Sequence, residues 1–352
     1  CGPRRSTKLR PMSRDHPAPP AGRIKMADIA RLAGVSTSTV SRALSGHKSI
    51  PQGLRDRIAE LAQAHGYVVN QSARSLRLQR THVIGVVVPL GHEREQLISD
   101  PFFLEMIGRL ADEITGRGYE VLLKKVVAPR TGWLQRIVQS QRSDGLLVIG
   151  QSDQHDALNT LADEYRPLVV WGGDIAERRY CTVGTDNVAG ARMAVQHLVA
   201  QGRRRIAFLG PPGAPEVELR RAGYLQALSE AGLTPEPDLF APAHFTIETA
   251  QPTVQALVDS GASFDAVFAA SDLIAMTAVQ TLKQAGRSVP EEVSVVGFDD
   301  IALAQHGAPP LTTVRQDLAA GARGMVDLLF RRIAGGAPES VFMAPELIVR
   351  QT

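Results

Sequence analysis

The chain has 352 residues, of which 44% are hydrophobic and 21% charged, a balance typical of a protein that buries the cores of two or three compact units. No apolar stretch approaches the roughly 20 residues that a membrane-spanning helix needs, and no apolar segment follows the basic N-terminus as in a secretory signal. The two cysteines, Cys1 and Cys181, exclude a disulfide framework and a cysteine-based zinc site. We therefore expect a cytoplasmic protein that has no membrane partner and binds neither a metal nor a cofactor.

Basic residues are concentrated at the start of the chain. Residues 1–80 contain 15 Lys and Arg against 4 Asp and Glu, whereas the remainder contains 24 against 32. A basic head on an acidic body indicates that the head meets a polyanion, although a solvated basic tail would give the same excess. Residues 1–23 are rich in Pro, Arg and Ser and lack hydrophobic periodicity, so we expect a disordered basic tail.

Residues 24–69 contain three short helical patterns. Gly34 ends the first pattern and can supply positive φ for a corner, and Ser36 is a favourable N-cap for a second helix over 37–44. A third helix is expected over 51–65, with proline in its first turn. This arrangement predicts a helix-turn-helix whose second helix enters the major groove of DNA, although an ordinary helical hairpin would show the same pattern.

Thr37, Ser38 and Arg42 are expected to face outward near the start of the second helix. Short hydroxyl side chains can contact base edges, and arginine can bond bidentately to guanine or to a phosphate. In an ordinary hairpin Arg42 would only be solvated.

After Arg80, apolar runs rich in β-branched residues alternate with amphipathic segments. The expected strands cover 83–89, 120–127, 145–149, 168–171, 205–210, 266–270 and 293–298, and the expected helices cover 102–117, 188–201, 222–231, 249–260 and 273–285. Strands and helices that alternate at this spacing predict doubly wound α/β sheets with parallel strands. A segment of more than 260 residues favours two such lobes.

The motifs of the head resemble those of the lactose/galactose repressor family. The matching residues are Asp28-Ile29-Ala30, Ala33-Gly34-Val35-Ser36, Thr39-Val40-Ser41-Arg42, Gly66-Tyr67, Asn70, Ala73, Arg74 and Leu76, and the resemblance extends over nearly the whole chain after Arg23. It implies an N-terminal all-α helix-turn-helix head and a two-lobed, periplasmic-binding-protein-like α/β core with parallel sheets. The lobes are expected at about 81–185 with 313–335 and at about 186–312 with 336–352.

The resemblance also implies that residues 70–80 form a hinge helix and linker, which folds when a homodimer binds a pseudo-palindromic operator. Leu76 would then be an apolar wedge in the minor groove, with Ala73 packed beside it. Lys25 stands where the family usually has a Ser or Thr cap, and it could still reach a phosphate. The expected DNA-binding residues are Lys25, Ser36, Thr37, Ser38, Thr39, Arg42, Asn70, Ala73, Arg74 and Leu76.

In the core, the resemblance implies a small effector, expected to be a sugar, between the lobes. Arg220 matches the family's ligand-clamping arginine, and Arg221 beside it is the solvated alternative. Asp299 matches the family's effector-binding aspartate at the end of a strand, whereas loop capping suits Asp300 better. The expected effector-binding residues are Phe102, Phe103, Gln151, Trp171, Arg220, Ser271, Asp272, Asp299 and Gln316.

Two local features of the core have open alternatives. We expect one of Phe102 and Phe103 to stack on the ligand and the other to join the core, while Asp100 can cap the helix that they begin. Gly172 stands where some sugar-binding relatives carry an aspartate, with Asp174 nearby, so the hydroxyl contacts are expected to be rearranged.

The sequence predicts no enzyme, because it contains no nucleophile elbow, phosphate-binding loop, zinc-protease motif or dinucleotide fingerprint. It predicts a sequence-specific DNA-binding transcription regulator. The expected role is a repressor of carbohydrate-utilisation genes whose operator affinity the effector controls. Two alternatives stay open: an effector that is a purine or a phosphorylated metabolite, and a sugar-binding module without gene control.

Overall fold

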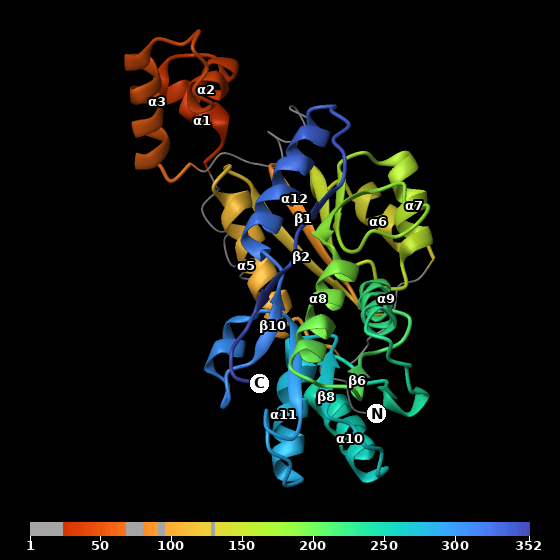
Figure 1. Ribbon diagram of the computed structural model, residues 1–352. Coiled ribbons are helices and arrows are strands. Elements are labelled where there is room, and N and C mark those ends of the chain that lie inside the picture. Colours follow the sequence, from red (N-terminus) through yellow and green to blue (C-terminus); the bar gives the residue numbers. More distant parts are fainter. Residues whose placement is uncertain (1–23, 68–79, 91–95, 128–130) are drawn as a thin grey trace, which may run out of the picture. The chain divides into compact units, whose positions relative to one another are not determined.

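The computed structural model describes residues 24–67, 80–90, 96–127 and 131–352 (Figure 1). The chain divides into two compact units, Cys1–Gln79 and Arg80–Thr352, which we describe separately as the head and the core. Within the described parts no helix is long and apolar enough to cross a membrane.

The head consists of three helices, α1 (Met26–Ala33), α2 (Thr37–Leu44) and α3 (Gln52–Ala64). Their apolar faces meet around Ile29, Val40 and Ile58, each of which is fully buried. Gly34 ends α1 with φ of 70°, a conformation that glycine adopts without the steric cost of a Cβ. The expected corner between the first two helices is therefore confirmed.

The core contains two six-stranded sheets. The first has the order β11-β5-β4-β3-β1-β2 and the second the order β12-β10-β9-β8-β6-β7. The first consists of β1 (Val83–Pro89), β2 (Glu120–Val126), β3 (Gly145–Ile149), β4 (Leu168–Trp171), β5 (Cys181–Thr185) and β11 (Val341–Met343). The second consists of β6 (Ile206–Leu209), β7 (Phe240–Ala241), β8 (Ala266–Ala269), β9 (Ser294–Asp299), β10 (Thr312–Arg315) and β12 (Glu346–Ile348). All the recorded strand pairs are parallel except β10 with β12.

Helices cover both faces of each sheet, as parallel strands require. The first lobe has α5 (Pro101–Thr115), α6 (Trp133–Gln139), α7 (His155–Glu164) and α12 (Leu318–Ile333). The second lobe has α8 (Asn187–Ala200), α9 (Pro215–Glu230), α10 (Ile247–Asp259) and α11 (Asp272–Gln284), with short 3-10 turns η1 (Pro237–Leu239) and η2 (Ala302–His306). Each sheet is buried between two apolar clusters, which explains why its central strands are continuous runs of apolar residues.

The expected boundaries of the lobes need correction at the C-terminal end. Residues 313–315 were assigned to the first lobe, but β10 pairs with β9 and β12 and so belongs to the second sheet. Residues 336–352 were assigned to the second lobe, but β11 pairs with β5 in the first sheet. The chain therefore crosses between the lobes after β5, after β10 and between β11 and β12. Backbone hydrogen bonds, which local composition does not reveal, decide the membership of such short strands.

Candidate functional site

The start of α2 presents the predicted DNA-reading side chains. The Ser36 hydroxyl accepts a hydrogen bond from the backbone N–H of Thr39 at 3.2 Å, which confirms Ser36 as the N-cap. Thr37, Ser38 and Arg42 are exposed, and Thr39 is half-buried. Ser36 also lies within 2.8 Å of the Ser38 hydroxyl. These short polar side chains leave the backbone of α2 accessible to a close approach.

Lys25 is the N-cap of α1, but its ammonium group cannot accept a hydrogen bond from the helix. The cap is instead supplied from inside the helix, because Asp28 Oδ2 accepts a bond from the Lys25 backbone N–H at 3.0 Å. Asp28 also pairs with Arg31 at 3.0 Å. The Lys25 side chain is therefore exposed and not required for capping.

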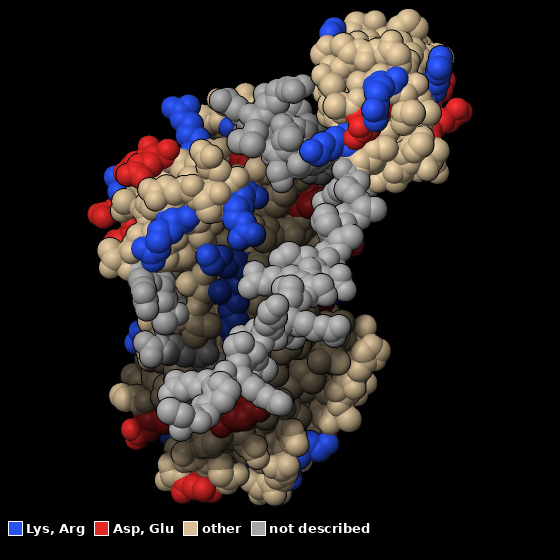
Figure 2. All heavy atoms as spheres, turned by 180° about the vertical axis from the view of Figure 1, so that it is seen from behind, with Lys and Arg blue, Asp and Glu red and all other residues tan. Residues whose placement is uncertain are grey.

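Figure 2 shows Lys and Arg side chains, and also Asp and Glu, on the face of the head that it draws. Residues 24–67 contain six Lys and Arg against three Asp and Glu, so the head has a positive net charge apart from the tail. The hinge residues Asn70, Ala73, Arg74 and Leu76, like the tail 1–23, lie outside the described residues.

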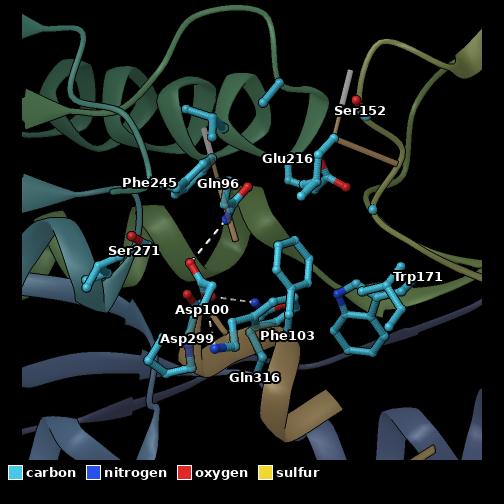
Figure 3. A pocket seen from close by; sticks show the side chains of 18 of the residues that line it. Gln96, Asp100, Phe103, Ser152, Trp171, Glu216, Phe245, Ser271, Asp299 and Gln316 are labelled. Carbon is cyan, nitrogen blue, oxygen red and sulfur yellow. Dashed lines mark hydrogen bonds between the residues drawn. The ribbon is translucent and has the colours of Figure 1, made fainter. Parts of the chain in front are cut away.

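In the core, a cavity lies between the two lobes (Figure 3). The ends of β1, β3 and β4 supply one side and the ends of β8, β9 and β10 the other, so carboxyl ends of strands from both sheets meet at the cavity, where α/β folds bind ligands. The lining comprises Pro89, Leu90, Gln96, Asp100, Pro101, Phe102, Phe103, Ile149, Gly150, Ser152, Trp171, Ala214, Glu216, Val217, Arg220, Phe245, Ser271, Leu273, Asp299, Ile301 and Gln316.

Arg220, on α9, is held rigidly in the cavity wall. Its Nε donates to Asn187 Oδ1 at 2.8 Å, its Nη1 donates to the carbonyl of Ala270, and its guanidinium lies 3.8 Å from the ring centre of Phe298. Nη1 also lies 3.8 Å from Asp299 Oδ1, and both side chains are buried. Burial lowers the pKa of Arg220, while the nearby carboxylates oppose this shift.

Asp299 and Asp300, at the end of β9, have φ angles of 121° and 57°. Positive φ costs a non-glycine residue about 1–3 kcal/mol and persists only where the surroundings enforce it. The Asp300 carboxylate accepts from Arg315 at 2.7 Å and from Arg350 at 2.6 Å, and Asp299 Oδ1 accepts from Gln316 Nε2 at 2.7 Å. These bonds hold the strained turn and place Asp299 and Gln316 together at the cavity, while Asp300 has the structural role expected for it.

Burial raises the pKa of Asp299 to about 7, against the opposing effects of Arg220 and of the bond from Gln316. Both protonation states therefore exist near neutral pH. The carboxyl can accept hydrogen bonds from ligand hydroxyls or donate one.

Aromatic side chains form a second part of the wall. Phe102 lies edge-on to Phe103 with ring centres 5.6 Å apart, and its ring centre is 6.5 Å from that of Trp171. Phe103 and Trp171 are buried in the apolar cluster of the first lobe, whereas Phe102 is half-buried and contacts the clusters of both lobes. Phe103 thus belongs mainly to the core, and Phe102 is the more accessible surface for stacking.

Gln151 does not line the cavity among the residues recorded there, although it was predicted to bind the effector. It is fully buried, and its side-chain amide exchanges hydrogen bonds with both backbone groups of Gly173, at 2.9 and 3.0 Å. A Cβ on Gly172 would lie 2.5 Å from Cδ of Gln151. Gln151 therefore fills the space that a side chain at Gly172 would need, which explains why glycine stands there.

Asp272 is also placed away from the recorded cavity lining, contrary to the prediction. It is fully buried beneath β9, where its carboxylate accepts from the Ile301 backbone N–H at 2.8 Å and from the Thr313 hydroxyl. Its neighbour Ser271 does line the cavity and caps α11 by accepting from the Ile274 N–H at 3.3 Å. Of these two neighbours after β8, Ser271 therefore lines the cavity and Asp272 stabilises the core.

Four polar residues of the lining were not predicted as binding residues: Gln96, Asp100, Ser152 and Glu216. Asp100 caps α5 by accepting from the Phe102 N–H at 2.9 Å, and its other oxygen accepts from Gln96 at 3.1 Å. Burial raises the pKa of Asp100. Glu216, in the first turn of α9, accepts from the Gln151 backbone N–H at 3.2 Å and so connects the two lobes. An acidic residue at a helix start ordinarily indicates helix stabilisation, so no local pattern distinguishes this position as a binding residue.

Comparisons with known proteins agree with this architecture. Residues 25–70 match the model of bacterial regulatory proteins of the lacI family, and residues 195–352 match that of the periplasmic binding protein-like domain. The HTH-type transcriptional regulator CelR of Thermobifida fusca is 34% identical over 92% of this chain and 96% of its own. The HTH-type transcriptional repressor CytR of Escherichia coli K12 is 34% identical over 92% of this chain and 95% of its own.

Solved structures show the same arrangement. A complex of the transcriptional regulator CelR with cellobiose has a TM-score of 0.68 at 30% identity, covering 94% of this chain and 99% of that one. The lac repressor dimer bound to operator and the anti-inducer ONPF has a TM-score of 0.82 at 23% identity, with the same coverage, and indicates the fold alone. With its complete head motif, its two-lobed core and these relatives over nearly its whole length, the chain belongs to the lacI family of bacterial regulatory proteins.

Proposed function

We propose that this regulator is a homodimeric, cytoplasmic repressor without enzymatic activity, whose head binds a pseudo-palindromic operator and whose core binds a sugar between its lobes. The proposal rests on one observation, that the same chain contains both features. The polar side chains at the start of α2 are exposed, and the core has a cavity whose walls are aromatic and hydrogen-bonding. The relative CelR is recorded in complex with cellobiose, which supports a carbohydrate effector.

The composition of the cavity suits a sugar. The apolar face of a pyranose can stack on Phe102 or Trp171, and its hydroxyls can bond Asp299, Gln316 and Arg220. Both lobes contribute to these contacts, so a bound ligand would favour one lobe angle over others. A change of lobe angle would in turn alter how the two heads of a dimer reach their half-sites.

Calorimetric titration with cellobiose, glucose, ribose and a purine base tests the ligand class. We expect a sugar to bind, and we expect Asp299→Ala or Arg220→Ala to weaken its binding at least tenfold, because each leaves ligand hydroxyls without a partner. Arg221→Ala is the matched control, since Arg221 is the exposed neighbour of Arg220 on α9 and pairs with Glu218. Binding of the purine alone, or sugar binding unaffected by both core variants, would contradict the proposed site.

Salt dependence of DNA binding distinguishes the repressor from a sugar-binding module without gene control. A dimer that makes several phosphate contacts should lose affinity steeply as salt rises, by roughly 10³-fold or more between 50 and 200 mM. Arg42→Ala should reduce both affinity and sequence preference. A chain that binds sugar but shows no preference for any site selected from random DNA would favour the alternative.

A surface for the second copy is available in the first lobe. Leu104 on α5 is 54% exposed and Leu123 on β2, the edge strand of its sheet, is 42% exposed. Sedimentation velocity should show a dimer, and Leu104→Glu with Leu123→Glu should shift it toward the monomer. A monomer in the unaltered chain at micromolar concentration would contradict the dimer.

A further inference from the structure

The charges around the cavity are unbalanced. Among the described residues that line it, Asp100, Glu216 and Asp299 carry carboxyl groups, whereas Arg220 carries the one cationic group.

The one cation is also already engaged. Arg220 stacks on Phe298, donates to Asn187 and to the Ala270 carbonyl, and lies 3.8 Å from Asp299. The carboxylates of Asp299 and Glu216 both act on its guanidinium electrostatically. A phosphate dianion entering this cavity would therefore meet a cation that already faces two carboxyl groups of the protein.

The remaining polar groups favour a ligand that donates hydrogen bonds. Carboxylate oxygens only accept when ionised, and one of the two amide N–H groups of Gln96 and of Gln316 is used in donating to Asp100 and Asp299. Ser152 and Ser271 are buried at the lining. The Ser152 hydroxyl donates to Asp153 at 2.9 Å and so presents its oxygen as an acceptor, whereas the Ser271 hydroxyl accepts from the Ile274 N–H and keeps its proton as a donor. Hydroxyl groups of a ligand donate as well as accept and so match this mixture of groups, whereas phosphate oxygens present only lone pairs or a single proton.

From this geometry we propose that the effector is an uncharged, unphosphorylated, hydroxyl-rich molecule, and that Glu216 is a specificity residue that rejects its phosphate ester. The inference rests on the proposed function, because it refines the ligand of the same cavity. It assigns to Glu216 a role beyond the bond to the Gln151 backbone N–H. Glu216 is half-buried, and its carboxyl group acts electrostatically on the Arg220 guanidinium. It would therefore also act on a charged ligand group that lies beside this guanidinium.

The proposal is tested by calorimetric titration of the full chain with sugars that differ only in the charge of one substituent. The probes are glucose, glucose 6-phosphate and 6-amino-6-deoxyglucose, with ribose, ribose 5-phosphate, cellobiose and inorganic phosphate beside them. We expect a neutral sugar to bind and inorganic phosphate not to bind. The phosphate ester of the sugar should bind at least about tenfold more weakly than the sugar itself, because like charges a few ångströms apart repel each other. The amino sugar should bind at least as well as its neutral parent.

Variants separate the effect of charge from that of bulk. Glu216→Gln should improve the affinity for the phosphate ester, relative to that for the neutral sugar, by about fivefold or more. Glu218→Gln is the matched control, because Glu218 is exposed on the same helix and is not part of the recorded lining. It should leave the ratio between ester and parent unchanged.

The possible outcomes are distinguishable. If a phosphate ester binds as tightly as its parent or more tightly, the present inference is overturned while ligand control is retained. The same holds if Glu216→Gln and Glu218→Gln alter the ratio equally. If neither a sugar nor a phosphate ester of the panel binds, the sugar-responsive function itself is contradicted, and the inference falls with it.

Discussion

Asp299 combines a backbone at positive φ with a buried carboxyl in the lining of the cavity between the lobes. The strain is tolerated because Gln316 fixes the carboxyl of Asp299, and Arg315 and Arg350 fix that of Asp300. Arg315 and Arg350 thus bond Asp300, while Asp299 lies in the cavity lining.

The titration of Asp299 has a testable effect on stability. Its pKa is raised to about 7 in the folded core from an ordinary value of 3.8, so between these values the folded state binds more protons than the unfolded state. The free energy of unfolding should therefore be greatest at the acid end of this window and fall as the pH rises through 7. Urea unfolding of the ligand-free chain between pH 5 and 8 should show a smaller fall for Asp299→Asn.

Part of the pH dependence should persist in that variant, because burial also raises the pKa values of Asp272 and Asp100. Asp112→Asn, at an exposed position of α5, is the control and should behave as the unaltered chain. An identical pH slope in Asp299→Asn and the unaltered chain would contradict the assignment.

Gly297 leaves room for a buried carboxylate behind the cavity, because it has no side chain. A Cβ there would lie 2.3 Å from Asp272 Oδ1, the carboxylate that holds Ile301 and Thr313. Gly297→Ala should therefore lower the stability of the core by about 1–3 kcal/mol, since the buried carboxylate must move. Gly324→Ala is the matched control, because its Cβ would meet only Val183 at 3.7 Å and it lies within α12. That change should be neutral or stabilising in thermal unfolding.

At the scale of the element, α2 depends on its cap because it has only eight residues, too few for a helix to be stable alone. Ser36→Ala should destabilise the head by about 1 kcal/mol, since the Thr39 N–H loses its acceptor. Hydrogen exchange in the full chain should show faster exchange of the α2 amides. Thr37→Ala, at the exposed first position of the helix, should have a smaller effect, and equal effects of the two changes would contradict the capping role.

The elements differ in how well the sequence predicts them. The strands β1, β3, β4, β8 and β9 were predicted within about one residue because each is a buried apolar run. By contrast β5, with the sequence Cys-Thr-Val-Gly-Thr, has no apolar pattern of its own. It is a strand because it pairs with β4 and β11 and because Gly184 permits a close approach to the Gly172 carbonyl. Contacts of this kind are not encoded locally.

The same distinction applies to the cavity. Phe102, Trp171, Arg220, Asp299 and Gln316 were predicted and lie together at its wall. Gln151 and Asp272 follow strand ends as well, but their side chains turn into the core, where a backbone amide pair and two hydrogen-bond donors satisfy them. Position after a strand predicts proximity to a ligand site, and it does not predict the direction of the side chain.

At the scale of the whole core, the chain crosses between the lobes three times, and the cavity lies between them. A ligand that contacts both lobes is therefore coupled to the angle between them. Contacts from both lobes already exist beside the cavity, as Glu216 on α9 bonds the Gln151 backbone after β3. A ligand that bridges the lobes can shift the equilibrium between lobe angles only by its difference in affinity for them. A repressor of this design must therefore show reciprocal linkage between ligand and operator.

The most direct test of ligand-controlled DNA binding is to measure both affinities on the same chain. An operator selected from random DNA is titrated with and without the sugar that binds the core, and the sugar is titrated with and without the operator. We predict that the sugar changes operator affinity by about 5- to 150-fold and that the operator changes sugar affinity by the same factor. Operator affinity that is indifferent to a saturating sugar would contradict the account.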